Sequence, residues 1–296
     1  MTIGLIDVDG HRFPNLALMK LSAHHKKMGD HVEWADMFGA YDRIYKSKVF
    51  TYSADETTCF DTKEIMQGGT GYSDHTVTLD DEIEHTYPDY SLYGIDYAMG
   101  FTTRGCPNKC SFCVVPKKEG NIRKHADIAE FWNGQKNTVL LDNNIISHDH
   151  GLSQLEWTIG KTRVDCNQGL DARIIAKDKD IQKLLGRVKW TRFIRLACDH
   201  KSQMPHIETS VRKIREKSGM KHSFFVYTLI TDDYDDSLAR LNFLKSLDGV
   251  DPFAQPYRDF NNTPPQKWQR QMARWANHKA IFRTTEWENY NNRSVV

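Results

Sequence analysis

The stretch Arg104-Gly105-Cys106-Pro107-Asn108-Lys109-Cys110-Ser111-Phe112-Cys113 holds three of the six cysteines of this 296-residue chain. The cysteines stand at positions i, i+4 and i+7, and the glycine and proline that open the stretch favour a loop. Three thiolates within eight residues can converge on one point. The stretch therefore predicts a site for a metal ion or a metal cluster.

The number of ligands bears on which metal is expected. Structural zinc usually takes four ligands as two separated pairs, but this chain has no second Cys-x-x-Cys pair, and Cys59, Cys166 and Cys198 stand alone. Iron-sulfur clusters commonly take four thiolates, so a cluster held by three leaves one iron open to another molecule. Two alternatives stay open, namely a zinc knuckle completed by a distant histidine such as His125 and a chance grouping of cysteines.

An aromatic residue, Phe112, directly precedes the last cysteine. With it, the motif resembles the radical S-adenosylmethionine (radical SAM) superfamily, whose signature is Cys-x3-Cys-x2-Cys. The resemblance implies that Cys106, Cys110 and Cys113 hold a [4Fe-4S] cluster and that SAM binds its open iron. It further implies that one electron, from a reductant such as flavodoxin or ferredoxin, cleaves SAM to methionine and a 5'-deoxyadenosyl radical. That radical would abstract hydrogen from a substrate.

Length and composition limit the other classes of protein to which the chain could belong. The length suits one large domain or one and a half domains, and a formal net charge of +1 gives no electrostatic case for a nucleic-acid partner. We expect neither a signal peptide nor a membrane helix, because no basic leader precedes an apolar run and no segment approaches about 18 apolar residues. Unpaired cysteines fit a reducing compartment, so we expect a cytoplasmic protein.

Residues 1–90 predict a small open α/β domain, a degenerate Rossmann-like unit. A strand at 3–8, a helical pattern from Leu16 to Met28 and a strand at 31–34 form a strand-helix-strand unit. A third strand is expected at 48–52, and residues 64–67 lead into the glycine-rich loop 68–71. The acidic, turn-rich segment 73–94 is the expected linker, with the domain boundary near Tyr90.

This first domain resembles, in shortened form, the N-terminal domain of the cobalamin-domain radical SAM enzymes. The Asp-x-His-x-x-Gly motif that supplies the cobalamin ligand is absent, because His11 has the wrong spacing. We therefore do not expect cobalamin. The loop Gly68-Gly69-Thr70-Gly71 would either wrap a phosphate with its backbone N–H groups or simply form a tight turn after a strand.

Residues 91–260 alternate between strands and helices. Strands are expected at 97–103, 138–142, 163–167, 192–197, 224–230 and 250–256, and helices at 126–132, 152–159, 178–185, 207–217 and 237–247. Apolar strands that alternate with amphipathic helices predict a parallel barrel, closed or open, with functional residues at the carboxyl ends of the strands. A partial (β/α)6 barrel is the core fold of the radical SAM superfamily, in which the cysteine loop also follows the first strand.

The resemblance assigns cofactor contacts to polar residues at the strand ends. After strand two, Asp142, Asn143 or Asn144 would meet the SAM amino group in place of the usual Gly-Gly-Glu. After strand four, Arg195 would meet the SAM carboxylate and Asp199 the ribose hydroxyls. The remaining expected cofactor contacts are Phe112 in the cysteine loop, Asn167 and Gln168 after strand three, and Gln255 near the adenine.

Each of these residues has a structural alternative. Asp142 and Asp199 could cap the following helices, and Arg173 and Arg195 could form structural ion pairs. Cys198 is a candidate radical-relay thiol, or else, like Cys166, a small buried apolar residue. A second metal site at His148 and His150 would have only two ligands, too few to assign one.

Residues 261–296 form the expected C-terminal extension. A helix over 266–279 carries Trp268, Met272 and Trp275 at helical spacing, a stripe that predicts packing on the barrel. The basic residues beside this stripe leave a nucleic-acid contact open as a weaker alternative.

The sequence thus favours a radical SAM enzyme whose substrate stays open among small molecules, nucleosides, bases and peptides. Two competing hypotheses are a non-catalytic protein that uses the cysteines to bind zinc or nucleic acid, and a radical SAM fold that has lost its chemistry.

Overall fold

The computed structural model describes residues 1–10, 12–74 and 77–291. This part of the chain is a mixed α/β protein with several parallel sheets and eleven α-helices, which agrees with the predicted fold class. Its contacts divide it into two units. Unit 1 comprises Met1–Gly100 and Ala126–Lys136, and unit 2 comprises Phe101–His125 and the chain from Asn137 onward. His11, on which the prediction about cobalamin depends, lies outside the described residues.

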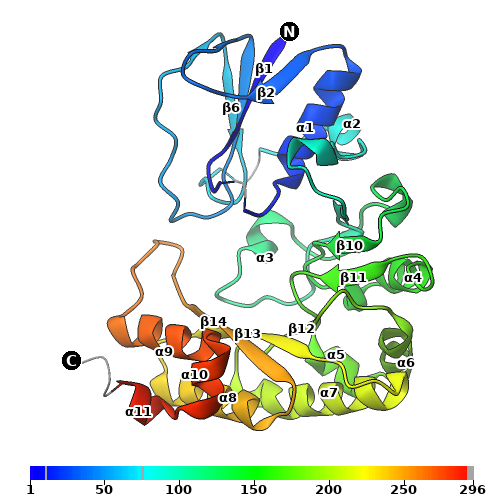
Figure 1. Cartoon of the computed structure of the whole chain (residues 1–296), viewed down its shortest axis with the longest axis vertical. Coiled ribbons are helices and arrows are strands. Elements are labelled where there is room, and N and C mark those ends of the chain that lie inside the picture. The colour runs from blue at the N-terminus through cyan, green and yellow to red at the C-terminus, as the bar shows by residue number, and fades with distance from the viewer. Residues whose placement is uncertain (11, 75–76, 292–296) are drawn as a thin grey trace. The chain divides into compact units, whose positions relative to one another are not determined.

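Unit 1 is built on a four-stranded parallel sheet in the order β2-β1-β4-β6 (Figure 1). Helix α1 (Leu16–Lys27) connects β1 to β2, which confirms the predicted strand-helix-strand unit. Asn15 caps this helix, since its side chain accepts a hydrogen bond from the Leu18 N–H and donates one to Ser47 Oγ at 2.8 Å. The strands are β1 (Thr2–Asp7), β2 (His31–Trp34), β4 (Arg43–Ser47) and β6 (Ile65–Gly68).

The two faces of this sheet bury separate apolar clusters, as the two-residue period of a strand requires. On the α1 side, Ile3 and Leu5 of β1 pack with Leu18, Leu21 and Tyr45. On the other side, the cluster consists of Ile6, Tyr41 and Ile44, with Val8, Ala35 and Phe60 packed against it.

The prediction of a strand at residues 48–52 is wrong, because β4 ends at Ser47. The carboxylate of Asp9 accepts hydrogen bonds from the Phe50 N–H at 3.3 Å and from Ser53 Oγ at 2.6 Å. These bonds hold the segment in a loop instead of a sheet ladder. A side chain 40 residues earlier therefore overrides the local strand propensity.

The predicted helix at 126–132 is also wrong, because only the 3-10 helix η2 (Ile128–Glu130) forms there. Asn133 and Gly134 follow at once, and the Trp132 indole donates to the Gln135 carbonyl at 2.7 Å. A segment this short cannot offset the cost of starting an α-helix. The other short elements of unit 1 are β3 (Ala40–Tyr41), β5 (Asp61–Thr62), α2 (Asp81–Glu84), the 3-10 helix η1 (Tyr90–Leu92) and β7 (Ala98–Gly100).

Unit 2 alternates parallel strands and helices, as predicted. Strands β10 (Asn137–Leu140) and β11 (Arg163–Cys166) pair in one sheet, and β12 (Ile194–Ala197), β13 (Phe224–Ile230) and β14 (Val250–Pro256) pair in another. Isolated parallel bridges at Val164–Trp190 and Leu170–Leu196 link the two sheets. The intervening helices are α4 (Asp149–Trp157), α5 (Ala172–Lys177), α6 (Lys179–Arg187), α7 (Met204–Ser218) and α8 (Tyr234–Ser246).

Strand β13 shows which side of this sheet is covered. Phe224, Val226, Thr228 and Ile230 are buried, while the alternate residues are only half-buried. Helices α7 and α8 run along one side of β12 to β14 (Figure 1). On the half-buried side, Phe225 stacks on Phe193 with ring centroids 5.5 Å apart.

The C-terminal helices belong to unit 2, where the first of them packs against β13 and β14. They are α9 (Lys267–Asn277), α10 (Lys279–Thr284) and α11 (Trp287–Asn291). Trp275 meets Phe282 edge to face at 4.9 Å in a cluster that includes Ile230 of β13. Helix α9 ends at Asn277. The side chain of Asn277 accepts a hydrogen bond from the Ala254 N–H at 2.7 Å and donates one to the Ala254 carbonyl at 2.9 Å. In the described part of the chain, no helix is both long and apolar enough to cross a membrane.

His222, between α7 and β13, makes the stability of the chain depend on pH. Burial, with a smaller contribution from the charge of Arg215, lowers the pKa of His222, and its Nε2 atom is buried with no hydrogen-bond partner among the described residues. The unfolded chain therefore takes up a proton below about pH 6.5 that the folded chain resists, so stability falls as the pH drops through that range.

We expect His222→Phe to flatten this pH dependence. The difference between variant and wild type should be roughly 0.5 kcal/mol per pH unit between pH 6.5 and 5, since partial exposure of the ring screens the effect. Urea denaturation at a series of pH values measures it. Parallel curves for the two proteins would contradict the prediction.

Candidate functional site

The cysteine stretch forms the loop of a short hairpin in unit 2. Its ends, β8 (Thr103–Arg104) and β9 (Arg123–Lys124), pair in antiparallel fashion, and α3 (Val115–Lys118) lies between them. The Arg104 guanidinium pairs with the Glu119 carboxylate at 2.8 Å, and the Cys106 N–H donates to the Gly120 carbonyl at 3.2 Å. Gly105 has φ of +81°, and a Cβ there would collide with the Asn121 carbonyl oxygen. Only glycine fits this entry to the loop.

The three cysteines of the loop are half-buried, and none is in a disulfide. The Cys113 N–H donates to the Cys110 carbonyl at 3.1 Å, which closes the last turn of the motif. Burial raises the pKa of Cys110 and of Cys113, and the neighbouring thiols and Asp199 raise it further. The thiols thus lie within electrostatic reach of one another. Within the described ranges, however, no group of three or more His, Cys, Asp or Glu side chains is arranged to hold a single metal ion.

The segment after β10 touches the cysteine loop through Asn144. This side chain is buried, and its Nδ2 atom lies 3.8 Å from Cys106 Sγ. Two polar atoms here, Asn143 Nδ2 and Asn144 Oδ1, are buried and have no hydrogen-bond partner in the part of the chain that the structure describes. Because buried polar atoms are nearly always paired in native proteins, two unpaired amide atoms beside a cysteine suggest that a polar ligand pairs with them.

Asp142 anchors the start of the loop. Its Oδ1 atom accepts hydrogen bonds from the hydroxyls of Thr102 and Thr103, both at 2.7 Å, and from their backbone N–H groups. The alternative that Asp142 caps a following helix is therefore wrong. Thr102 and Thr103, at the start of the hairpin, thus already engage this carboxylate, and the neighbouring polar side chains at this strand end are Asn143 and Asn144.

The segment after β11 holds the loop from a second direction. The Asp171 carboxylate accepts a hydrogen bond from the Asn108 side chain in the loop at 3.1 Å. It also pairs with Arg173 through two bonds, of 2.9 and 2.6 Å. Arg173 therefore forms the structural ion pair given as its alternative. Its charge in addition acts on Cys110, where it favours the thiolate.

Two other predicted residues of this segment, Asn167 and Gln168, form no hydrogen bond with the cysteine loop among the described residues. The Asn167 carbonyl accepts a hydrogen bond from the Tyr227 hydroxyl at 2.6 Å, and the Gln168 side chain is exposed.

Asp199, at the end of β12, also bears on the loop. Its Oδ1 accepts a hydrogen bond from the Leu229 N–H at 2.9 Å. Burial raises the pKa of Asp199, and its charge is among the causes that raise the pKa of Cys110 and Cys113. The capping role given as its alternative is wrong, because His200 is the residue at the start of the following 3-10 helix, Lys201–Gln203. Residues that follow β10 and β11 therefore contact the cysteine loop, and Asp199, which follows β12, acts electrostatically on two of its cysteines.

Arg195 lies within β12, and its guanidinium bonds to the side chains of two neighbouring residues. Its Nε and Nη2 bond both carboxylate oxygens of Asp165 at 2.6 and 2.7 Å, and its Nη1 donates to the Tyr227 hydroxyl at 3.1 Å. This is the structural ion pair that the sequence left open as an alternative. A contact between Arg195 and a SAM carboxylate would require this pair to break.

The remaining predicted residues lie in less reactive surroundings. Cys198 has no exposed surface, and burial raises its pKa to about 12, which fits a small buried apolar residue better than an accessible thiol. Phe112 and Gln255 are exposed. His148 caps α4, since its Nδ1 accepts a hydrogen bond from the His150 N–H at 3.1 Å.

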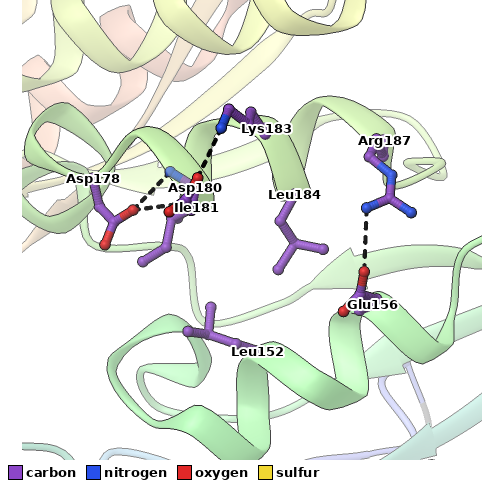
Figure 2. Close-up of a pocket in the computed structure, with 8 residues that line it drawn as sticks. All are labelled: Leu152, Glu156, Asp178, Asp180, Ile181, Lys183, Leu184 and Arg187. Carbon is purple, nitrogen blue, oxygen red and sulfur yellow. Dashed lines mark hydrogen bonds and ion pairs between the residues drawn. The ribbon is translucent and has the colours of Figure 1, made fainter.

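A shallow groove of about 350 Å³ lies away from the cysteine loop, between α4 and α6 (Figure 2). Leu152 of α4 faces Ile181 and Leu184 of α6 across it. Ion pairs of surface residues, Glu156 with Arg187 at 3.2 Å and Asp180 with Lys183 at 2.9 Å, border it. None of the predicted site residues lines this groove.

The sequence did not reveal that Asn108 and Asp171 help to position the cysteine loop. Their side chains join the cysteine loop to the segment after β11, 63 residues along the chain, and no local pattern encodes that contact. The only available signal was the density of polar residues after the third predicted strand. No protein-family model matches this chain, and comparison with curated proteins finds no similar sequence.

Proposed function

We propose that this chain is a radical SAM enzyme, which cleaves S-adenosylmethionine reductively and abstracts a hydrogen atom from a substrate. The observation that carries the proposal is the convergence of three successive strand ends on a loop with three free cysteines. Ligand sites of parallel α/β proteins lie at the carboxyl ends of the strands. In this proposal the five parallel strands β10 to β14 belong to the partial (β/α)6 barrel of the superfamily.

The donor set fits a [4Fe-4S] cluster. Cys106, Cys110 and Cys113 would supply three thiolates, and such a cluster would leave one iron open for SAM. When bound, the cluster supplies the electron that cleaves SAM. The unpaired amide atoms of Asn143 and Asn144 offer a donor and an acceptor for a polar ligand such as the amino acid part of SAM.

Other side chains of this site would hold the cysteine loop in place and set the electrostatic environment of the cysteines. Asp142 and Asp171 fix the two flanks of the cysteine loop. Arg173, beside Cys110, would stabilise the thiolate form that metal ligation requires. Asp199 is a half-buried carboxylate whose Oδ2 forms no hydrogen bond with the described residues, and it would serve as the acceptor for ligand hydroxyls.

The proposed reaction needs an external reductant, a substrate and protection from water. The chemistry requires a one-electron reductant such as flavodoxin or ferredoxin, and a substrate that is a small molecule, a nucleoside or a peptide. The half-buried aromatic side chains of Phe225 and Tyr227 on β13 would shield reactive species from water.

The test is anaerobic reconstitution with iron and sulfide, followed by reduction in the presence of SAM and chromatography for 5'-deoxyadenosine. We expect about four irons per chain and 5'-deoxyadenosine from the wild type. Cys110→Ala should lose both, because two thiolates do not hold such a cluster stably.

Cys59→Ala is the matched control. Cys59 is an exposed free cysteine in unit 1, so its loss should leave the iron content and product unchanged. A colourless protein that retains one zinc per chain would refute the proposal and favour a zinc-binding loop. An iron-loaded protein that forms no 5'-deoxyadenosine would indicate a fold that has lost its chemistry.

A further inference from the structure

The carboxyl edge of the parallel sheet in unit 1 is a second place where a ligand can bind. In the order β2-β1-β4-β6, the chain leaves β1 for β2 on one side and then continues to β4 on the other. The sheet therefore changes direction between β1 and β4. In open parallel sheets, ligands bind outside the carboxyl ends of the strands at such a point. Lys48 is the first residue after β4.

Lys48 carries a charge that the described residues do not balance. The residue is only 8% exposed, and its ammonium forms no hydrogen bond or ion pair with any described residue. Its Nζ lies 5.6 Å from the centroid of the Tyr72 ring, and Lys46 Nζ lies 5.7 Å from the same centroid. Two ammonium groups thus converge on one ring. Since like charges repel and the Lys48 ammonium has no ion-pair partner among the described residues, an anion beside it would stabilise the arrangement.

The acidic groups of this edge already have partners within unit 1. Asp55 pairs with Lys46 at 3.3 Å and accepts a hydrogen bond from the Tyr72 hydroxyl at 2.9 Å. Asp9 holds the loop after β4 through Phe50 and Ser53, and Asp7 accepts a hydrogen bond from Tyr93. Among the described residues of this edge, Lys48 is therefore a charged group without an ion-pair partner.

The glycine turn after β6 packs directly on Lys48. Gly69 has φ of +111°, and a Cβ there would collide with the Lys48 carbonyl oxygen. A Cβ on Gly71 would meet Lys48 Cγ at 2.5 Å and the Phe50 carbonyl oxygen at 2.9 Å. The turn thus needs glycine at both positions, because its backbone lies against Lys48 and against the start of the loop that carries Phe50.

That loop presents an aromatic pair to solvent. The rings of Phe50 and Tyr52 stack with centroids 5.3 Å apart and an angle of 20° between their planes. They are 46% and 51% exposed. A planar ring can stack on such a pair, and an aromatic surface beside an unmatched lysine is suited to a ligand that has both a ring and a phosphate.

We propose that this edge of unit 1 binds a nucleotide, with its phosphate at Lys48 and its base against Phe50 and Tyr52. The proposal rests on residues of unit 1 alone and is independent of the cysteine loop. It adds a nucleotide-binding function to the function proposed above.

Calorimetric titration of the full chain with GMP, CMP and UMP, and with the matching nucleosides, tests this proposal. Adenine compounds are avoided because they could enter the candidate SAM site. We expect at least one nucleotide to bind, and Lys48→Met, which keeps the length and apolar character of the stem, to weaken it about tenfold or more. The same variant should leave the affinity for the nucleoside unchanged, whereas Tyr52→Ala should weaken both ligands.

Lys27→Met is the matched control, since Lys27 is an exposed lysine at the end of α1 in the same unit. It should bind nucleotides as the wild type does. The proposal is overturned if none of the three nucleotides binds the wild type below millimolar concentration, or if Lys48→Met binds the nucleotide as tightly as the wild type. Inorganic phosphate that binds as tightly as the nucleotide would overturn the assignment of the base.

Discussion

Asp142→Ala is expected to lower the free energy of unfolding by about 3 to 4 kcal/mol. The substitution leaves two backbone N–H groups and two hydroxyls, those of Thr102 and Thr103, without their acceptor in a buried site. An unsatisfied buried donor costs about 1–3 kcal/mol, and the four donors would share some relaxation. Urea denaturation of the purified variant measures the change.

Asp142→Asn separates the hydrogen bonds from the charge. Burial raises the pKa of Asp142, which shows that desolvation opposes its charged form in spite of these bonds. An asparagine keeps an oxygen at the Oδ1 position, so we expect it to retain most of the stability that alanine loses. Asp248→Asn, at an exposed pair with Lys221, is the control and should leave the denaturation midpoint unchanged. A loss below about 1 kcal/mol for the alanine variant would contradict the anchoring role.

Arg240→Met is expected to cost about 3–5 kcal/mol. Arg240 has no exposed surface, and its guanidinium bonds the Cys198 carbonyl at 3.0 Å, the Leu229 carbonyl at 2.8 Å and the Asp236 carboxylate at 2.5 Å. Methionine fills a similar volume but removes the ion-pair partner of a buried carboxylate and the donors to two carbonyl groups. Because those carbonyls belong to residues at the ends of β12 and β13, Asp199 should also lose its fixed position.

Thermal and urea denaturation measure the loss at Arg240. Arg212→Met is the control, since Arg212 lies on the exposed side of α7, where it pairs only with Glu216 at 2.9 Å. Its denaturation midpoint should equal that of the wild type. Arg240→Lys should fall between the two, because an ammonium cannot bridge three acceptors that surround a planar fork. Equal stabilities for Arg240→Met and Arg212→Met would refute the bridging role.

Most elements of unit 2 could be predicted from local pattern. Strands β13 and β14 have the predicted bounds, and each end of β10, β11 and β12 lies within two residues of its predicted position. In such segments the apolar period and the strand propensity agree with the burial that the fold imposes. At residues 48–52 the propensity favoured a strand, but Asp9 holds that segment in a loop, and no local pattern contains this bond.

The candidate site could be predicted only in part from the sequence, for the same reason. Spacing along the chain singled out Cys106, Cys110 and Cys113, and the polar strand ends were visible as a class. The partner of each side chain was not visible, because Asp142, Asp171 and Arg195 bond to residues 30 to 63 positions away. Their roles depend on which strands become neighbours, and this is a property of the folded sheet.

The sequence by itself thus determined the α/β class, the alternation of strands and helices and the cysteine motif, since these depend on residues a few positions apart. Only the tertiary structure decided that Asp142 and Asp171 hold the cysteine loop, that Arg195 is engaged by Asp165, and that Lys48 has no counter-charge in the described part of the chain. Hydrogen bonds and ion pairs need atoms about 3 Å apart, and for residues distant in the chain only the fold determines such distances.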